Sequence, residues 1–234
     1  FDTARRLVIT PFRHEERLIG ALVIACSGEC ACDRKGLDVI NLISKNVALP
    51  DVDHVEPGGV NGFEHMANGP RLVEFLTEMR DEVFGDRADE YLLIGETPGL
   101  PPELAAVLTD RGDPILDMVF GFDHLDVDHE GDKFVGRPFD LVALKEILGR
   151  WQTVVGDGGW NSLYWCNHDQ PRIVSRWGDD QRYWRESATM LATVLHLHRG
   201  TPFVYQGEEL GMTNAGFDTL DQYRDIESLN YAAQ

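Results

Sequence analysis

Hydrophobic and polar positions follow two kinds of pattern along most of the chain. Short, nearly continuous apolar runs are typical of strands buried on both faces, and they fall at residues 37–43, 91–94, 115–122, 163–166 and 202–205. Apolar residues spaced three and four apart are typical of amphipathic helices, and they fall at residues 63–84, 141–155 and 184–198. Strands that alternate with helices predict a parallel sheet flanked by helices.

Two α/β architectures meet this pattern, the doubly wound sheet and the eight-stranded barrel. The chain has no G-x-G-x-x-G motif after a strand, no phosphate-binding loop and no G-x-S-x-G elbow, so dinucleotide, NTPase and serine-hydrolase functions lack their signatures. Polar residues do follow several predicted strands, among them Glu96, His168 and Asp169. Catalytic groups of a barrel lie at the carboxyl ends of its strands. We therefore expect a (β/α)8 TIM barrel rather than a doubly wound sheet.

Composition excludes several classes of partner. The 234 residues are 43% hydrophobic and 26% charged, as in ordinary globular proteins. A formal charge of -19 repels phosphate backbones, so we expect no nucleic-acid partner. No apolar run approaches the ~18 residues of a membrane-spanning helix, and no secretion signal is recognisable, so we expect no membrane partner either.

Residues 1–36 differ from the rest of the chain. They hold six basic and five acidic side chains, so the remaining residues carry a net charge of -20. Three of the four cysteines, Cys26, Cys30 and Cys32, also lie there. Their C-x3-C-x-C spacing matches no common zinc site, which predicts free thiols and no metal there. With no cofactor-binding motif in the chain, we also expect no cofactor. We expect an atypical N-terminal segment over 1–36, followed by the barrel over 37–234.

Three acidic residues stand at or near the predicted strand ends, namely Asp38, Glu96 and Asp169. Cleavage of a glycosidic bond needs one carboxylate as nucleophile or base and one protonated carboxyl group to assist the leaving oxygen. A third anionic group can favour an oxocarbenium-like transition state. Spacing alone leaves a second interpretation open, in which these residues are solvated loop acids or helix caps.

Four sequence blocks resemble, in order, those of α-glucosidases of glycoside hydrolase family 13. Residues 165–172 (WCNHDQPR) with 175–179 (SRWGD) resemble one block, and residues 200–212 (GTPFVYQGEELGM) resemble the block at the last barrel strand. Residues 93–99 (LIGETPG) are similar to the acid/base block, and residues 38–45 (DVINLISK) to the stretch that begins at the nucleophile. The resemblance covers residues 37 to about 230 and implies the C-terminal half of the barrel, about strands 4 to 8.

The resemblance also implies a role for each matching residue. Asp38 is the expected nucleophile that forms a glycosyl-enzyme. Glu96 is the expected acid that protonates the departing oxygen and later activates water, which requires a raised pKa. Asp169 is expected to hold the hydroxyls of the bound glucose, His168 to hydrogen-bond the same sugar, and Arg172 to lie at the rim of the pocket.

Valine directly after the nucleophile is associated in this family with a preference for α-1,6 bonds, and Val39 stands there. The chain therefore resembles oligo-1,6-glucosidases, with an isomaltose-like oligosaccharide as the expected substrate and the cytoplasm as the expected location. Sucrose isomerases and trehalose synthases share the same machinery and differ in how water is excluded. The sequence leaves that alternative open.

Two departures from the family pattern predict impaired activity. Gly36 stands where the family has an arginine that orients the nucleophile, and the family's early D-x-x-x-N-H block is absent. The chain is thus expected to start near strand four, as a truncated product whose first 36 residues are read out of frame or replaced. A non-catalytic, glycosidase-like scaffold or partner protein is the alternative.

Overall fold

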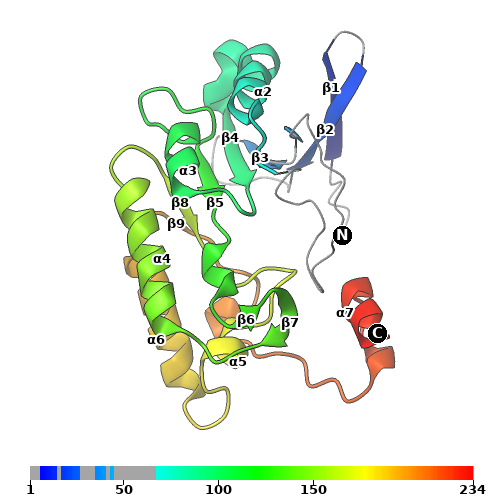
Figure 1. The fold of residues 1–234 in the computed structure, drawn as a ribbon, viewed down its shortest axis with the longest axis vertical. Helices are drawn as coiled ribbons and strands as arrows, with labels where there is room; N and C mark the ends of the chain where they lie inside the picture. The colour runs from blue at the N-terminus through cyan, green and yellow to red at the C-terminus, as the bar shows by residue number, and fades with distance from the viewer. Residues whose placement is uncertain (1–5, 15–16, 27–34, 41–42, 45–66, 234) are drawn as a thin grey trace. The chain divides into compact units, whose positions relative to one another are not determined.

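The computed structural model describes residues 6–14, 17–26, 35–40, 43–44 and 67–233, and Figure 1 shows them as a coloured ribbon. The chain divides into two compact units. The first comprises residues 1–127, 140–162 and 199–201, and the second comprises residues 128–139, 163–198 and 202–234. Each unit has its own elements and its own buried side chains.

Five strands lie in one sheet in the order β3-β4-β5-β8-β9. Their bounds are β3 Lys35–Ile40, β4 Tyr91–Glu96, β5 Met118–Phe120, β8 Asn161–Leu163 and β9 Thr201–Pro202. The pairs from β3 to β8 are parallel. Parallel strands that pair in chain order are typical of a barrel. The predicted parallel sheet is confirmed.

Three strands are shorter than the apolar runs that predicted them. β5 takes three residues of the run 115–122, and β9 ends at Pro202, whereas the prediction extended to Tyr205. The fourth run contributes only Leu163 to β8, so the prediction of a strand through Cys166 is wrong. The rest of that run is nevertheless buried. An apolar run indicates burial, and a segment without strand pairing can be buried as well.

The first α-helix that the structure describes in the first unit is shorter than its pattern. A helix predicted over residues 63–84 is observed as α2 (Leu72–Met79), which continues into a π-helical turn over Arg80–Phe84. Residues 63–66 lie outside the described part of the chain. The apolar positions of α2 face inward, because Leu72 and Leu76 are each 1% exposed.

Two further helices complete the first unit. The predicted helix at 141–155 is confirmed as α4 (Leu141–Val154), and it begins where the Asp140 carboxylate accepts a hydrogen bond from the Ala143 amide at 2.9 Å. Helix α3 (Pro102–Leu108) was not predicted. Its start signals were proline in the first turn, which loses no intrahelical bond there, and the acidic Glu103 in the same turn.

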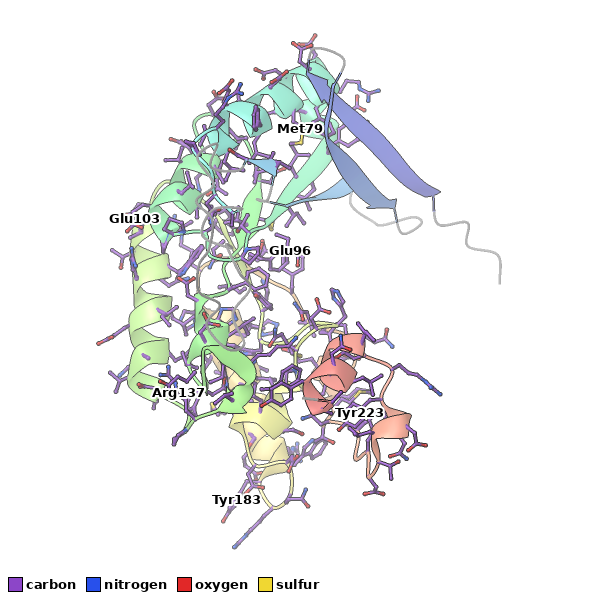
Figure 2. All side chains as sticks on the ribbon, turned by 45° about the vertical axis from the view of Figure 1, so that its right-hand side comes forward. Met79, Glu96, Glu103, Arg137, Tyr183 and Tyr223 are labelled. Atoms are coloured by element: carbon purple, nitrogen blue, oxygen red, sulfur yellow. The ribbon has the colours of Figure 1, made fainter. Side chains whose placement is uncertain are left out.

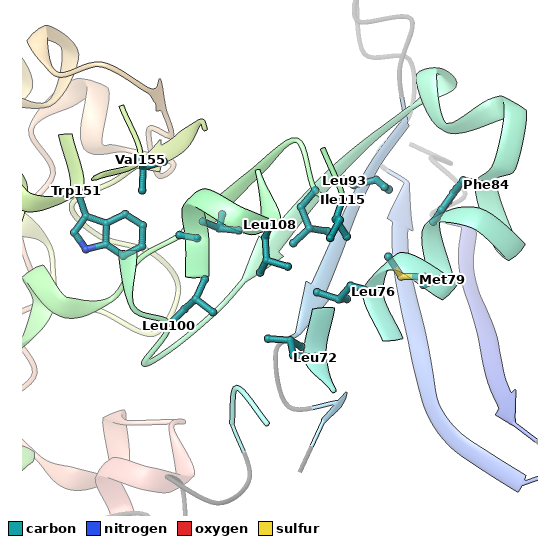
Figure 3. Close-up of a cluster of buried hydrophobic side chains, with 13 residues drawn as sticks. Leu72, Leu76, Met79, Phe84, Leu93, Leu100, Leu108, Ile115, Trp151 and Val155 are labelled. Atoms are coloured by element: carbon teal, nitrogen blue, oxygen red, sulfur yellow. The ribbon is translucent and has the colours of Figure 1, made fainter. Parts of the chain in front are cut away.

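The core of the first unit lies between these helices and β4. Figure 3 shows Leu76 of α2, Leu93 of β4 and Leu108 of α3 in one cluster of buried side chains, with Trp151 and Val155 at its other end. All five are less than 6% exposed. Burial of such side chains is the main favourable contribution to folding, at about 25 cal/mol per Å² of apolar surface. This packing fixes the strand that ends at Glu96.

The described part of the second unit combines a short antiparallel pair with three α-helices. The strands are β6 (His129–Glu130) and β7 (Asp132–Gly136). The helices are α5 Ile173–Trp177, α6 Trp184–Leu197 and α7 Ile226–Ala232. Helix α6 confirms the helix predicted over residues 184–198. Trp165 anchors the segment before the expected site, since its indole N–H donates to the Leu191 carbonyl of α6 at 2.8 Å.

The N-terminal part of the chain forms an antiparallel hairpin of β1 (Arg6–His14) and β2 (Arg17–Cys26), which the sequence pattern did not predict. The boundary predicted near residue 36 stays a prediction. Among the described residues, no helix is long and apolar enough to cross a membrane.

Candidate active site

The first two expected acids lie on neighbouring strands. Asp38 of β3 pairs in register with Ile94 of β4, and Ile40 pairs with Glu96, the last residue of β4. Glu96 therefore lies two positions beyond the partner of Asp38. Because residues two apart on a strand share a face, the register places positions 38 and 96 on the same face of the sheet. Figure 2 labels Glu96 at the end of its strand.

The strand that presents Glu96 is fixed on both sides of this residue. On one side, the Asp117 carboxylate accepts a hydrogen bond from the Leu93 amide at 2.7 Å. On the other, Thr97 is 1% exposed and its hydroxyl donates to the Phe120 carbonyl at 2.8 Å. Gly95 allows close packing, since a Cβ there would lie 2.9 Å from the Leu116 side chain. Glu96 itself is half-buried.

His168 and Asp169 lie in a turn of the second unit. The Asn167 side-chain oxygen accepts a hydrogen bond from the Asp169 amide at 2.8 Å, which closes the turn. The His168 Nε2 atom lies 3.2 Å from an Asp169 carboxylate oxygen. These side chains are 73% and 63% exposed within the described structure. The turn therefore presents an imidazole and a carboxylate together on its open side.

Arg172 connects two of the sequence blocks. Its guanidinium donates to the Gln206 carbonyl at 2.6 Å and lies over the Tyr205 ring, 4.6 Å from its centre. Its amide donates to the Asn214 side chain at 2.7 Å. These contacts tie the segment after Asp169 to the block at 200–212. Arg172 is not among the residues that line the cavity of the second unit, which is described next.

A cavity of about 460 Å³ lies within the second unit, and both His168 and Asp169 line it. The remaining lining residues are Asp128, Lys133, Phe134, Gly136, Gln170, Pro171, Arg176, Asp225 and Ser228. Gln170 and Arg176 lie inside the recognised sequence blocks, which was a signal that could have identified them. Phe134 and Ser228 lie outside every block, and no sequence signal singled them out.

The wall of this cavity contains an ion pair. Two nitrogens of the Arg176 guanidinium each lie 2.6 Å from an oxygen of Asp128, and the Trp177 indole donates to the same carboxylate at 2.8 Å. The two charged side chains are 10% and 14% exposed. Burial opposes ionisation of Asp128, but the hydrogen bonds from Arg176 and Trp177 outweigh it and lower the pKa of the carboxyl.

A thiol next to the turn is hydrogen-bonded to a half-buried acid. The Cys166 thiol donates to a carboxylate oxygen of Glu208 at 3.0 Å. Burial, reinforced by this bond and by the negative charge of Glu208, raises the pKa of Cys166 to about 12. Burial also raises the pKa of Glu208, against the hydrogen bonds that it accepts. The sequence analysis did not predict that Cys166 and Glu208 lie in contact.

Among the residues that the structure describes, no three histidine, cysteine, aspartate or glutamate side chains lie together as a metal site. The expected absence of a metal and of a cofactor stays a prediction. Gly36 of β3 pairs with Leu92 of β4. The expected loss of orientation of the nucleophile, which follows from glycine at this position, stays a prediction as well.

The chain is similar to known proteins over most of its length. The model of the family described as "Alpha amylase, catalytic domain" matches residues 33–232. An oligo-1,6-glucosidase of Bacillus cereus is 51% identical over 195 residues, and a trehalose-6-phosphate hydrolase of Bacillus subtilis is 48% identical over 196 residues. Both matches cover 83% of this chain.

Solved structures of related enzymes also superpose on this chain. The trehalose-6-phosphate hydrolase of Bacillus licheniformis superposes with a TM-score of 0.75 at 49% identity, covering 83% of this chain and 34% of that one. An isomaltulose synthase of Erwinia rhapontici reaches the same TM-score at 31% identity, over 85% of this chain and 35% of that one. The chain spans about a third of the length of the curated relatives it matches, 35% for the Bacillus cereus enzyme. This chain belongs to the family of the α-amylase catalytic domain, and its parallel sheet is part of a TIM barrel.

Proposed function

We propose that the protein hydrolyses terminal α-glucosidic bonds in short oligosaccharides, with α-1,6 bonds favoured, by a retaining mechanism. The observation that carries this proposal is the register of β3 and β4, in which Asp38 and Glu96 occupy one face of neighbouring parallel strands. Neighbouring strands lie ~4.8 Å apart and a strand rises ~3.3 Å per residue, so positions 38 and 96, offset by two residues, lie ~8 Å apart between Cα atoms. The two carboxyl groups of retaining glycosidases lie ~5–5.5 Å apart, which is within the reach of an aspartate and a glutamate side chain from such positions.

The proposed reaction has two steps. Asp38 attacks the anomeric carbon while Glu96 gives its proton to the departing glycosidic oxygen, so that the glycosidic bond breaks and a glycosyl ester forms. Glu96, now ionised, then removes a proton from water, and the water oxygen displaces Asp38. Two inversions leave the configuration at the anomeric carbon unchanged. The glucose released first is therefore the α-anomer.

Sugar recognition is proposed for the turn of the second unit. A glucose ring has hydroxyl groups at its edge and apolar C–H faces. His168 and Asp169 offer a hydrogen-bond donor and acceptors to hydroxyl groups, and both line a cavity that also holds the aromatic ring of Phe134. Phe134 stacks on Tyr231, with ring centres 4.5 Å apart. Polar groups beside an aromatic wall suit an oligosaccharide better than a wholly apolar ligand.

The linkage preference is supported by Val39 and by the relatives. Oligo-1,6-glucosidases of several bacilli are 46–51% identical to this chain, and a glucan 1,6-alpha-glucosidase of Streptococcus pneumoniae is 46% identical. The isomaltulose synthases that superpose on the chain are 31–32% identical. Hydrolysis is thus the better supported activity, and sucrose isomerisation is the alternative to test.

The experiment incubates the purified full protein with isomaltose, maltose, sucrose and trehalose 6-phosphate, and follows the products by proton NMR. We expect isomaltose to be cleaved fastest and α-glucose to appear before its β-anomer. Preferred cleavage of trehalose 6-phosphate, or conversion of sucrose into an isomer without net hydrolysis, would replace the proposal. Absence of turnover on all four sugars would favour the non-catalytic alternative.

The cytoplasmic location is also proposed. Its support is the low cysteine content of residues 37–234, which hold Cys166 alone, together with an oligosaccharide substrate, since disulfide-rich sequences are typical of oxidising compartments. Fractionation of cells that make the protein tests it, and recovery from the culture medium would contradict it.

A further inference from the structure

We propose that Asp128, Arg176 and Gln170 are positioning residues that hold the turn carrying His168 and Asp169 in its sugar-binding conformation. The proposal rests on the function proposed above and adds three residues to it. None of the three is assigned a role in bond cleavage. They act through the turn.

The contacts form a continuous path to the turn. Arg176 uses Nε and Nη2 to bind Asp128, both at 2.6 Å, and its remaining nitrogen Nη1 donates to the Gln170 side-chain oxygen at 2.9 Å. Gln170 directly follows Asp169. The guanidinium is held in one plane by its bidentate pairing, so the third nitrogen has a fixed direction. The position of Gln170 is therefore set by a rigid group.

The turn is also tied at its other side. The Asn167 side-chain oxygen accepts a hydrogen bond from the Asp169 amide at 2.8 Å, and the Asn167 carbonyl accepts one from the Gln170 amide at 3.3 Å. Asn167 and Gln170 thus bracket the two sugar-binding side chains. His168 and Asp169 are themselves exposed within the described structure, so packing around their side chains does little to orient them. The two brackets hold the backbone from which both side chains project.

A purely stabilising role does not account for this geometry. A buried ion pair is weak support for stability, because desolvation offsets most of its attraction. Asp128 comes from the segment before β6, whereas Arg176 comes from α5, 48 residues later in the chain. The pair and Gln170 all lie on the wall of the cavity that His168 and Asp169 line. The path therefore ends at the proposed sugar site.

The main test replaces Gln170 by alanine in the full protein, with Gln181→Ala as the matched control. The Gln181 side chain is exposed and donates a hydrogen bond to the carboxylate of its neighbour Asp180 at 3.0 Å. We expect Gln170→Ala to lower kcat/KM for isomaltose about tenfold or more, since a small misplacement of positioning groups costs up to ~100-fold. Gln181→Ala should match the wild type, and both variants should keep the wild-type melting temperature.

A second pair of variants examines the geometry of the guanidinium. Arg176→Lys keeps the charge but cannot bind Asp128 with two nitrogens and Gln170 with a third. Arg182→Lys is the control, because Arg182 is exposed and lies over the Tyr183 ring. We expect Arg176→Lys to lower kcat/KM at least as much as Gln170→Ala. The proposal is wrong if Gln170→Ala retains wild-type kcat/KM and Arg176→Lys loses activity only in proportion to unfolded protein.

Hydrogen exchange separates this proposal from the proposed function. The Asp169 and Gln170 amides both donate within the turn, so Gln170→Ala should speed their exchange while leaving the amides of α6 unchanged. If the wild type cleaves none of the tested sugars, the proposed function fails, and the exchange rates still decide whether Gln170 holds the turn. Unchanged exchange at both amides would overturn the positioning role.

Discussion

Glu96 has to be protonated when it meets the glycosidic oxygen and ionised when it activates water. Glutamine at this position keeps the size of the side chain and removes the transferable proton. We expect Glu96→Gln to lower kcat on isomaltose by about 10²–10⁴-fold, the usual contribution of general acid–base catalysis. The measurement is glucose release at saturating substrate.

The matched control for this prediction is Glu103→Gln. Glu103 lies on α3, is exposed, and pairs with Arg150 at 2.9 Å. Figure 2 labels Glu103 and Glu96 on different elements. An exposed ion pair contributes at most ~1 kcal/mol, so the control should keep wild-type kcat. Equal losses in the two variants would contradict the assignment of Glu96 as the acid.

Cys166 is expected to resist alkylation in the folded protein. With a pKa of about 12, only about one molecule in ten thousand carries the thiolate at pH 8, and the thiolate is the reactive form. Iodoacetamide followed by peptide mass spectrometry should leave Cys166 unmodified without denaturant and modify it fully in urea. Glu208→Gln removes a negative charge from beside the sulfur and should speed the reaction.

The same residues show what the sequence could predict about the site. His168 and Asp169 were predicted because they lie in a recognisable block. Asp128 was not, because its role depends on Arg176, which lies 48 residues away in the chain. A contact between distant residues leaves no local pattern. Motifs therefore identified groups expected to touch the sugar, whereas the groups that hold them needed the fold.

Elements differ in how well their patterns predict them. Helix α4 was predicted because an N-cap aspartate and a repeating apolar stripe agree. Helix α3 was missed, since its seven residues are too few for a clear period. Even the stripe of α4 was only partly right. Leu144 is buried, but Leu141 at the first turn is 57% exposed, because a helix end can extend past the core.

The difference in burial between leucines of the two helices supports a prediction about the core. Leu108 of α3 is fully buried in the cluster of the first unit, so Leu108→Ala should leave a cavity and lower the free energy of unfolding by about 2–5 kcal/mol. Leu141→Ala is the matched control and should change it by less than about 0.5 kcal/mol. Urea unfolding followed by fluorescence measures both. Similar losses for the two variants would show that the cluster is not the core.

At the scale of the whole molecule, the formal charge of -19 makes stability depend on pH through repulsion as well as through individual carboxyl groups. Self-repulsion grows as acids ionise, and it is nearly the same in variants that differ by one charge. Differences between variants therefore isolate single groups. Asp128 and Glu208 suit such a comparison, because their pKa values are shifted in opposite directions.

For Asp128 the folded pKa is lowered, so its contribution to stability is present above the unfolded value of ~3.9 and is lost as the pH falls through the folded value. Asp128→Asn should therefore cost about 3 kcal/mol of stability at pH 7 and progressively less in acid.

For Glu208 the folded pKa is raised, so its favourable contribution to stability is present below the unfolded value of ~4.3 and is lost as the pH rises through the folded value. Glu208→Gln should accordingly gain stability relative to the wild type as the pH rises from 4 to 7. Urea unfolding at several pH values between 2 and 8 measures both differences, with the Asp128 change expected below pH ~4 and the Glu208 change above it. Parallel curves for the three proteins over this whole range would contradict both assignments.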